Sequence, residues 1–108
     1  MGKRKKRVYI AGPMKGKPSH NVEQFAIADA YLKSEGYDTA NPVEIGDVFG
    51  PPEAIERNPT LLNAVITREL IELMDCDAIY LLRGWENSAG ARRELLHALT
   101  IGLEIIVQ

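Results

Sequence analysis

Cysteine, histidine and long apolar runs are all scarce in this sequence. Its single cysteine, Cys76, cannot form an internal disulfide, so we expect the protein in a reducing compartment. No apolar run reaches the length of a membrane span, and the basic start is not followed by the apolar core of a signal peptide. We therefore expect a cytoplasmic protein in which Cys76 is a buried or half-buried thiol without a catalytic role.

Metal ligands and an excess of one charge are lacking as well. His20 and His97 are far apart in the sequence, and no pair of ligand residues has the spacing of a metal site. We expect neither a metal nor another cofactor. The formal net charge of −2 gives no general attraction to nucleic acids or to membranes.

What the sequence does contain is typical of one globular domain. At 108 residues, with 45% hydrophobic and 26% charged residues, the chain can bury a single core, and we assign residues 1–108 to one domain. Basic residues gather at positions 3–7. We interpret residues 1–6 as a flexible, solvated tail, and contact of this tail with nucleic acid is the alternative.

Strand-like and helical patterns alternate along the chain. Four segments have the composition of strands, at Arg7–Ala11, Tyr37–Ala40, Ala78–Leu82 and Glu104–Val107. Three helices are predicted between them, one capped by Ser19 or Asn21 and ended by Gly36, one from Thr60 to Met74, and one from Ser88 to Ile101. This alternation predicts an α/β fold with a parallel sheet of four to five strands in the order 2-1-3-4 and helices on both faces.

The segment from Val43 to Pro59 carries glycines and prolines that interrupt any long element. We predict a long loop here, and such a loop in a small domain is usually a lid or is mobile. Phe49 within it either closes over a ligand or anchors the loop.

Two glycine-bearing loops are expected to meet at one edge of the sheet. They are Gly12–Pro18, after the first strand, and Arg83–Gly90, after the third. In parallel sheets ligands bind beyond the carboxyl ends of the strands, where the strand order reverses. If the first and third strands are central neighbours, the two loops form a pocket.

The two loops together suit one phosphate group. The first offers the backbone of Gly12, Met14 and Gly16 with the cations of Lys15 and Lys17. The second offers an N-capping serine, a helix N-terminus and a further glycine, which we assign to phosphate binding as Ser88 and Gly90. Neither loop is a P-loop or a dinucleotide fingerprint, and ordinary turn glycines are the alternative reading.

Two carboxylates can reach the same pocket, Glu94 from the last helix and Glu69 from the helix before the third strand. Paired carboxylates suit reactions at an anomeric carbon, because one attacks or stabilises the oxocarbenium-like centre while the other handles protons. The alternative is that both are solvated helix charges beside Arg93 and Arg68.

Three motifs carry a resemblance that covers nearly the whole chain: residues 8–16 (VYIAGPMKG), 76–79 (CDAI) and 84–94 (GWENSAGARRE). The sequence resembles the nucleoside 2-deoxyribosyltransferase superfamily. It is most like the small phage and bacterial proteins of the uncharacterised branch, and it is similar to 2′-deoxynucleoside 5′-phosphate N-hydrolases. The third motif is the specific one.

The resemblance implies a flavodoxin-like three-layer sandwich that cleaves the N-glycosidic bond of a deoxynucleotide. It implies that Glu94 attacks C1′ of the deoxyribose and that Ser88 binds the 5′-phosphate with the loop of Lys15 and Gly16. Glu69 stands where the family has an aspartate, so its carboxylate is one methylene further out in a site sensitive to such shifts. The family commonly forms dimers or larger assemblies, so we expect a homodimer.

We therefore predict an N-glycosidase that hydrolyses a 2′-deoxynucleoside 5′-monophosphate to the free base and deoxyribose 5-phosphate. A deoxyribosyltransferase that exchanges bases is one alternative, and a nucleotide-binding or sensing module without catalysis is another. Selectivity for the base is expected to depend on Trp85, Asn41 and Phe49. Trp85 either stacks on a base or fills an interface.

Overall fold

The computed structural model describes residues 4–108, and its centre is one sheet of four parallel strands. The strand order is β2-β1-β3-β4, with β1 at Arg7–Ala11, β2 at Asp38–Ala40, β3 at Ala78–Leu81 and β4 at Glu104–Val107. All three strand pairs are parallel. The predicted α/β class, strand order and flavodoxin-like arrangement are confirmed.

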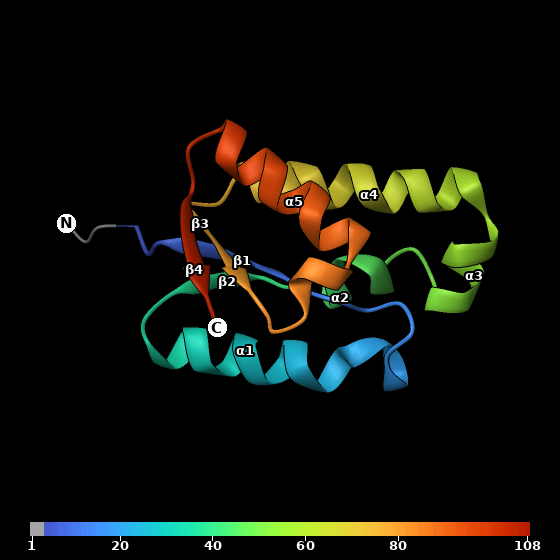
Figure 1. The fold of residues 1–108 in the computed structure, drawn as a ribbon, viewed down its shortest axis with the longest axis horizontal. Helices are drawn as coiled ribbons and strands as arrows, with labels where there is room; N and C mark the ends of the chain where they lie inside the picture. Colours follow the sequence, from blue (N-terminus) through green and yellow to red (C-terminus); the bar gives the residue numbers. More distant parts are fainter. Residues whose placement is uncertain (1–3) are drawn as a thin grey trace.

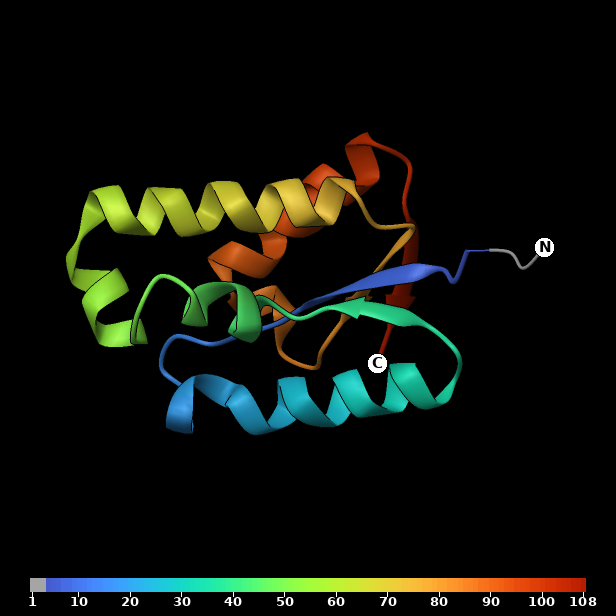
Figure 2. The same ribbon diagram turned by 180° about the vertical axis from the view of Figure 1, so that it is seen from behind.

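Helices cover both faces of the sheet (Figure 1). The helices are α1 (Val22–Ser34), α2 (Pro42–Asp47), α3 (Pro52–Arg57), α4 (Pro59–Met74) and α5 (Ala89–Thr100), with 3-10 turns η1 (Pro18–Asn21) and η2 (Trp85–Asn87). Helix α1 lies on one face, and α4 and α5 lie together on the other. Figure 2 shows the same three layers from behind.

The two faces have separate cores because side chains alternate along each strand. On β1, Val8 and Ile10 pack with Phe25 of α1. Tyr9 points to the opposite face and belongs to the core cluster that contains Leu73 of α4. Each of these side chains is fully buried.

The predicted helix caps were right at one helix of three. Ser88 caps α5, because its hydroxyl accepts a hydrogen bond from the Ala91 N–H at 3.1 Å. Asn21 occupies the N-cap position of α1, but its amide donates to the Pro13 carbonyl instead, at 2.9 Å. Thr60 as the cap of α4 was wrong, since Asn58 accepts from the N–H groups of Thr60 and Leu61.

The prediction of a long loop from Val43 to Pro59 was also wrong, because most of this segment forms the short helices α2 and α3. Pro42 and Pro52 each stand in the first turn of one of these helices. Proline has no N–H to lose there, and its fixed φ suits the first turn. The prolines therefore begin helices here rather than prevent them.

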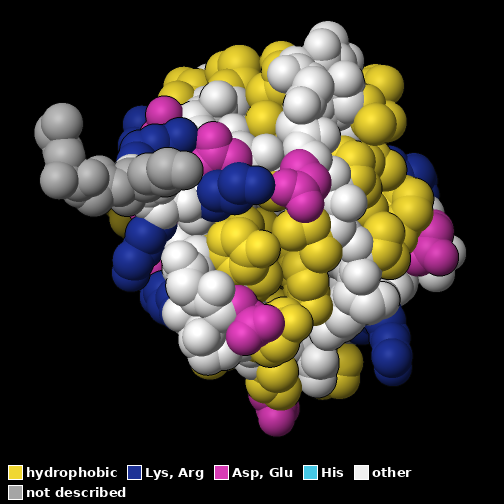
Figure 3. All heavy atoms as spheres, turned by 90° about the vertical axis from the view of Figure 1, so that its left-hand side faces the viewer, with side chains coloured by type: hydrophobic (Ala, Val, Ile, Leu, Met, Phe, Trp, Pro, Cys, Tyr) yellow, Lys and Arg dark blue, Asp and Glu magenta, His cyan; other side chains and the backbone are white. Residues whose placement is uncertain are grey.

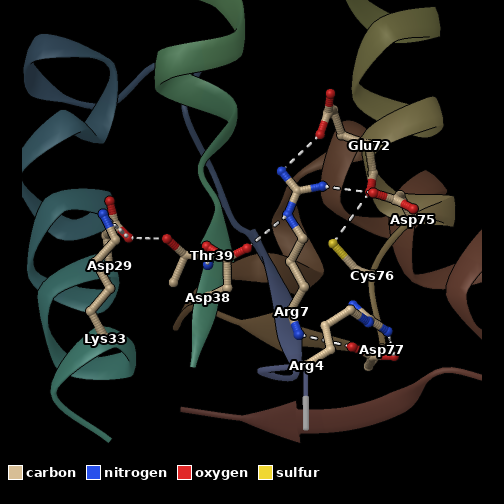
Figure 4. Close-up of polar contacts among 10 residues, drawn as sticks. All are labelled: Arg4, Arg7, Asp29, Lys33, Asp38, Thr39, Glu72, Asp75, Cys76 and Asp77. Atoms are coloured by element: carbon tan, nitrogen blue, oxygen red, sulfur yellow. Dashed lines mark hydrogen bonds and ion pairs between the residues drawn. The ribbon is translucent and has the colours of Figure 1, made fainter. Parts of the chain in front are cut away.

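The amino ends of the strands are joined by ion pairs around Arg7, which Figure 4 shows. Its guanidinium lies 2.9 Å from Glu72 of α4, 3.2 Å from Asp75 and 3.7 Å from Asp38. The side chains of Arg7 and Glu72 are 23% and 16% exposed, so this pair is better shielded from solvent than the rest. The cluster ties α4 to β1 at the end of the sheet where the strands begin.

Part of the predicted basic tail is held against the domain by exposed ion pairs. Arg4 lies 3.0 Å from Asp77, and Lys6 lies 3.6 Å from Glu104. Residues 1–3 lie outside the described residues. Among the helices of residues 4–108, none has the length and apolar character needed to cross a membrane.

Cys76 is buried, as predicted, and its thiol donates to the Glu72 carbonyl at 3.2 Å. Burial raises the pKa of this thiol to about 12. Because the thiolate is the reactive form, Cys76 is a weak nucleophile at neutral pH.

Candidate active site

A pocket of about 350 Å³ opens beyond the carboxyl ends of β1 and β3. Its walls come from the loop after β1, the N-terminus of α5, one side of α4 and the helix α3. Seven of the residues singled out from the sequence line it: Gly12, Met14, Lys15, Glu69, Ser88, Gly90 and Glu94. Segments distant in the sequence thus bring both predicted carboxylates and the predicted anion-binding groups to one site.

Three predicted site residues lie outside this pocket. Gly16 forms a turn with φ of +80°. Asn41 is buried, and its side-chain oxygen accepts a hydrogen bond from the Val43 N–H at 3.0 Å. It lines a second pocket together with Phe49. Trp85 begins η2 and packs against the core cluster on the α4–α5 face.

Glu94 is held at the floor of the pocket by a buried strand residue. The residue is only 8% exposed, and its carboxylate accepts a hydrogen bond of 2.5 Å from the hydroxyl of Tyr9. Tyr9 itself is fully buried in the middle of β1. The sequence did not single out Tyr9, because an aromatic residue in an apolar strand is typical of core packing.

Two of the three carboxyl groups that line the pocket, those of Glu69 and Glu94, have raised pKa values. Burial, and next the charge of Glu69, raises the pKa of Glu94 to about 8, against the opposing effects of the Tyr9 hydrogen bond and of Arg93. Burial raises the pKa of Glu69 to about 7, again opposed by Arg93. The pair therefore shares protons near neutral pH, with one group charged while the other stays protonated. Such a pair can supply both an ionised carboxylate and a proton donor.

Arg93 is a pocket residue that the sequence analysis did not single out as part of the site. It precedes Glu94 on α5, lines the pocket and lowers the pKa of both carboxyl groups. A pair of charges on adjacent helix residues is usually a solvated surface feature, so its sequence position gave no signal. In the folded chain Arg93 is half-buried beside the carboxylates.

The predicted anion-binding groups lie where the N-terminus of α5 meets the pocket. Ser88 uses a lone pair to cap the helix, which leaves its hydroxyl proton free to donate. Gly90 lies in the first turn, and Lys15 brings a cation from the loop after β1. A helix N-terminus with a cation beside it favours a negatively charged group.

The rest of the pocket is apolar and was not predicted. Its lining includes Phe25, Pro42, Pro52, Ile55, Leu62, Val65 and Ile66. Most of these residues come from the segment that the sequence pattern assigned to a loop, or from the first half of α4. Two polar side chains, His20 and Glu56, accompany them.

The loop after β1 reaches the pocket through a strained stretch of backbone. Ser19, His20 and Asn21 have φ values of 48°, 54° and 64°, in the left-handed region that side chains disfavour. The Asn21 amide holds this stretch to the Pro13 carbonyl. Residues held in such conformations often stand at functional sites.

Metal binding is the other chemistry to consider for this site. Residues 4–108 contain no group of three or more His, Cys, Asp or Glu side chains placed to hold an ion.

Comparison with protein families shows one match for this chain. Residues 6–107 match the family model described as a domain of unknown function, DUF4406. The chain belongs to this family. The match spans the whole of the sheet and every residue of the pocket. No curated protein matches the chain.

Proposed function

We propose that the protein is an N-glycosidase that hydrolyses a 2′-deoxynucleoside 5′-monophosphate to the free base and deoxyribose 5-phosphate. One observation carries the proposal: two carboxyl groups of raised pKa, Glu94 and Glu69, line one pocket together with an anion-binding helix N-terminus. Cleavage at an anomeric carbon needs such a carboxyl pair, and a phosphate on the substrate needs such a helix terminus. The resemblance of residues 84–94 to deoxyribosyltransferase-type enzymes supports the same reading.

The reactive form has Glu94 ionised and Glu69 protonated, which is the minor singly charged form because the pKa of Glu94 is the higher of the two. In the first step, the Glu94 carboxylate attacks C1′ of the deoxyribose as the N-glycosidic bond breaks. The departing base takes a proton from the protonated Glu69 carboxyl, which leaves a deoxyribosyl ester on Glu94 and a free base. The Tyr9 hydroxyl orients the attacking carboxylate through its 2.5 Å hydrogen bond. Burial in the low-dielectric pocket strengthens these electrostatic contacts.

In the second step, water attacks C1′ of the ester and gives a proton to the Glu69 carboxylate. The Glu94 carboxylate leaves, and deoxyribose 5-phosphate is released with both carboxyl groups restored. Throughout, the 5′-phosphate is bound by Ser88, Gly90 and Lys15, which keeps C1′ in register with the carboxyl pair.

The test is to incubate the protein with each deoxynucleoside 5′-monophosphate, including modified pyrimidines, and to measure free base by chromatography. We expect release from at least one nucleotide and a loss of roughly a thousandfold or more in Glu94→Ala, because a nucleophile is removed. Glu86→Gln is the matched control, since Glu86 is exposed on η2 outside the pocket. Release that survives Glu94→Ala would refute the mechanism, and no release from any nucleotide would refute the function.

A second arm separates hydrolysis from base exchange. Labelled free base is added during turnover, and incorporation of the label into nucleotide is measured beside the yield of deoxyribose 5-phosphate. Hydrolysis predicts sugar phosphate in step with released base and no labelled nucleotide. Labelled nucleotide without net release of sugar phosphate would instead identify a transferase.

We also propose that the protein acts as a homodimer in the cytoplasm. Large apolar side chains are exposed on α5 and on the edge strand β4, with Leu96, Leu99 and Val107 each more than half exposed. Figure 3 shows hydrophobic side chains gathered across one end of the molecule. Exposed apolar clusters of this kind favour self-association.

The proposed cytoplasmic location rests on the cysteine content. The single buried thiol suits a reducing compartment.

A further inference from the structure

The pocket has a polar half and an apolar half, and the proposed chemistry uses only the polar one. Glu69 and the apolar residues Val65 and Leu62 all line the pocket from α4. Since a helix rises about 1.5 Å per residue, the lining runs roughly 10 Å along α4 from Glu69 to Leu62. That length matches the part of a nucleotide that extends beyond C1′, on the side away from the phosphate.

The far half of the pocket is closed by α3. Ile55 on this helix is buried and lines the pocket opposite Phe25 of α1. Figure 2 shows α3 at one end of the molecule, close to the start of α1. Apolar residues from α1, α3 and α4 thus line this half of the pocket, and such a lining suits an aromatic ring. We refer to this half as the apolar slot.

Two polar side chains stand in this apolar half. The Nε2 atom of His20 lies 3.5 Å from the Oε1 atom of Glu56, and both residues line the pocket. This separation is longer than a usual N–H···O hydrogen bond, so the two groups keep hydrogen-bonding capacity for a third partner. The neighbouring Asn21 holds His20 in its left-handed conformation by its bond to Pro13.

The remaining polar lining residues already have roles. Lys15 and Ser88 belong to the phosphate end, and Glu69, Arg93 and Glu94 belong to the reaction centre. His20 and Glu56 have no part in either group. Their placement beside an apolar slot is the pattern of a recognition site, where apolar walls bind a ring and a few polar groups read its edge.

We propose that His20 and Glu56 are the specificity-determining residues of the base subsite, with the base stacked in the slot beneath α3. Glu56 accepts hydrogen bonds from N–H groups on the base edge, and the His20 imidazole bonds to the neighbouring ring or carbonyl position. This inference rests on the proposed function for the identity of the ligand. It replaces Trp85, Asn41 and Phe49, which lie outside the pocket, as the expected determinants of selectivity.

The test measures binding rather than turnover. In a Glu94→Gln background, affinities are measured by calorimetry for the deoxynucleoside 5′-monophosphates and for deoxyribose 5-phosphate, which lacks a base. Glu56→Gln is compared with Glu53→Gln, an exposed carboxylate on the same helix that does not line the pocket. His20→Asn is the second variant, because asparagine tolerates the left-handed backbone of that position.

We expect the preferred nucleotide to bind more tightly than deoxyribose 5-phosphate. Glu56→Gln should weaken binding of this nucleotide roughly tenfold or more, because a charged acceptor facing the base edge is replaced by a neutral amide that has one acceptor oxygen and an added NH2 donor. The affinity for deoxyribose 5-phosphate, which has no base, should change by about twofold at most. The order of preference among the bases should change in both Glu56→Gln and His20→Asn, and Glu53→Gln should bind as the parent does.

Equal weakening of all ligands, unchanged affinities, or nucleotides that bind no better than the sugar phosphate would overturn the inference. Base release by the wild-type protein is measured separately. Release with an unchanged base preference in Glu56→Gln would refute the base subsite and leave the proposed function standing. A base-dependent loss of binding without any release would refute the cleavage reaction alone.

Discussion

Glu94 and Glu69 are best understood as one titrating unit. Each is buried enough to resist ionisation, and the charge of Glu69 raises the pKa of Glu94 further. Tyr9 and Arg93 act in the opposite direction, since both favour the charged form of Glu94. The order of the two pKa values makes ionised Glu69 with protonated Glu94 the commoner singly charged form at neutral pH. The proposed cleavage therefore uses the minor form, in which the proton has moved from Glu94 to Glu69.

Tyr9→Phe should slow base release and shift its dependence on pH. The hydroxyl lowers the pKa of Glu94, so its loss raises that pKa and moves the acidic limb of kcat/KM to higher pH. A hydrogen bond to a charged group is worth about 1.5–3 kcal/mol, which predicts a rate loss of roughly 10- to 100-fold. Tyr80→Phe is the control, because Tyr80 is buried on the opposite face of the sheet. An unshifted profile in Tyr9→Phe would show that this hydrogen bond does not tune the nucleophile.

The raised pKa values also predict how stability depends on pH. Glu69 and Glu94 bind protons more tightly in the folded chain than in the unfolded one, where the ordinary value is 4.5. Their contribution is therefore complete below about pH 4.5 and is lost as the pH rises through about 7 to 8. We expect the free energy of unfolding to fall by up to a few kcal/mol over this range.

Urea unfolding of the wild type and of Glu94→Gln between pH 5.5 and 8.5 checks this. The variant removes one of the two titrating groups, so the loss of stability with pH should be smaller than in the wild type. Equal slopes in the two proteins would contradict a raised pKa at Glu94.

At the scale of elements, the loop after β1 is positioned by the close approach of the Gly12 backbone to the Leu82 side chain. A Cβ atom added at Gly12 would lie 2.7 Å from the Cβ of Leu82, at the end of β3. Such a distance forces the loop or the strand end to move. Glycine at this position lets the two loops that line the pocket come together.

Gly12→Ala should destabilise the protein by about 1–3 kcal/mol, the usual cost of overpacking. Gly46→Ala is a matched substitution, since an added Cβ there meets nothing within 4 Å and Gly46 lies inside α2. Alanine in a helix interior is favoured by roughly 0.5–1 kcal/mol, so this variant should be slightly more stable. Denaturant midpoints of both variants give the measurement, and equal midpoints would show that the contact with Leu82 is easily relieved.

The sequence predicted the sheet and the polar half of the pocket because their signals are local. Buried strands, the N-capping Ser88 and the two glycine-bearing loops each depend on a few adjacent residues. The rule that ligands bind where strand order reverses then brought the loops together. The apolar half was missed because the prolines between Val43 and Pro59 were read as breakers, although Pro52 begins a helix.

Side-chain direction accounts for the other errors. Tyr9 and Ile10 are neighbours in one apolar run, and only the pleat of β1 decides which of them reaches Glu94. Trp85 stands in the expected loop but turns toward the core, and Asn41 caps α2. Patterns in the sequence predict which loops converge, whereas packing decides which atoms enter the pocket.

For the whole molecule, the ion-pair cluster and the candidate active site lie at opposite ends of the strands. The Arg7 ion-pair cluster lies where the strands begin, and the pocket lies where β1 and β3 end. Between them run two layers of apolar packing. The proposed self-association would use a third surface, on α5 and β4.

Leu99→Glu should convert the proposed dimer to a monomer, because it places a charge on the exposed apolar surface of α5. Light scattering coupled to size-exclusion chromatography measures the mass of each form. Thr100→Glu adds the same charge at the next residue, which is exposed and polar, and should leave the mass unchanged. A wild-type protein that elutes as a monomer at high concentration would refute the proposed dimer.

The segment between β2 and α4 forms the helices α2 and α3 and adds no strand to the sheet. Together with the start of α4 they supply most of the apolar wall of the pocket, while Tyr9, Ser88 and Glu94 come from the scaffold itself. The apolar wall and the proposed reaction centre therefore come largely from different segments of the chain. Apolar substitutions within residues 41–58 should change which ring the pocket accepts and leave the hydrogen bond between Tyr9 and Glu94 in place.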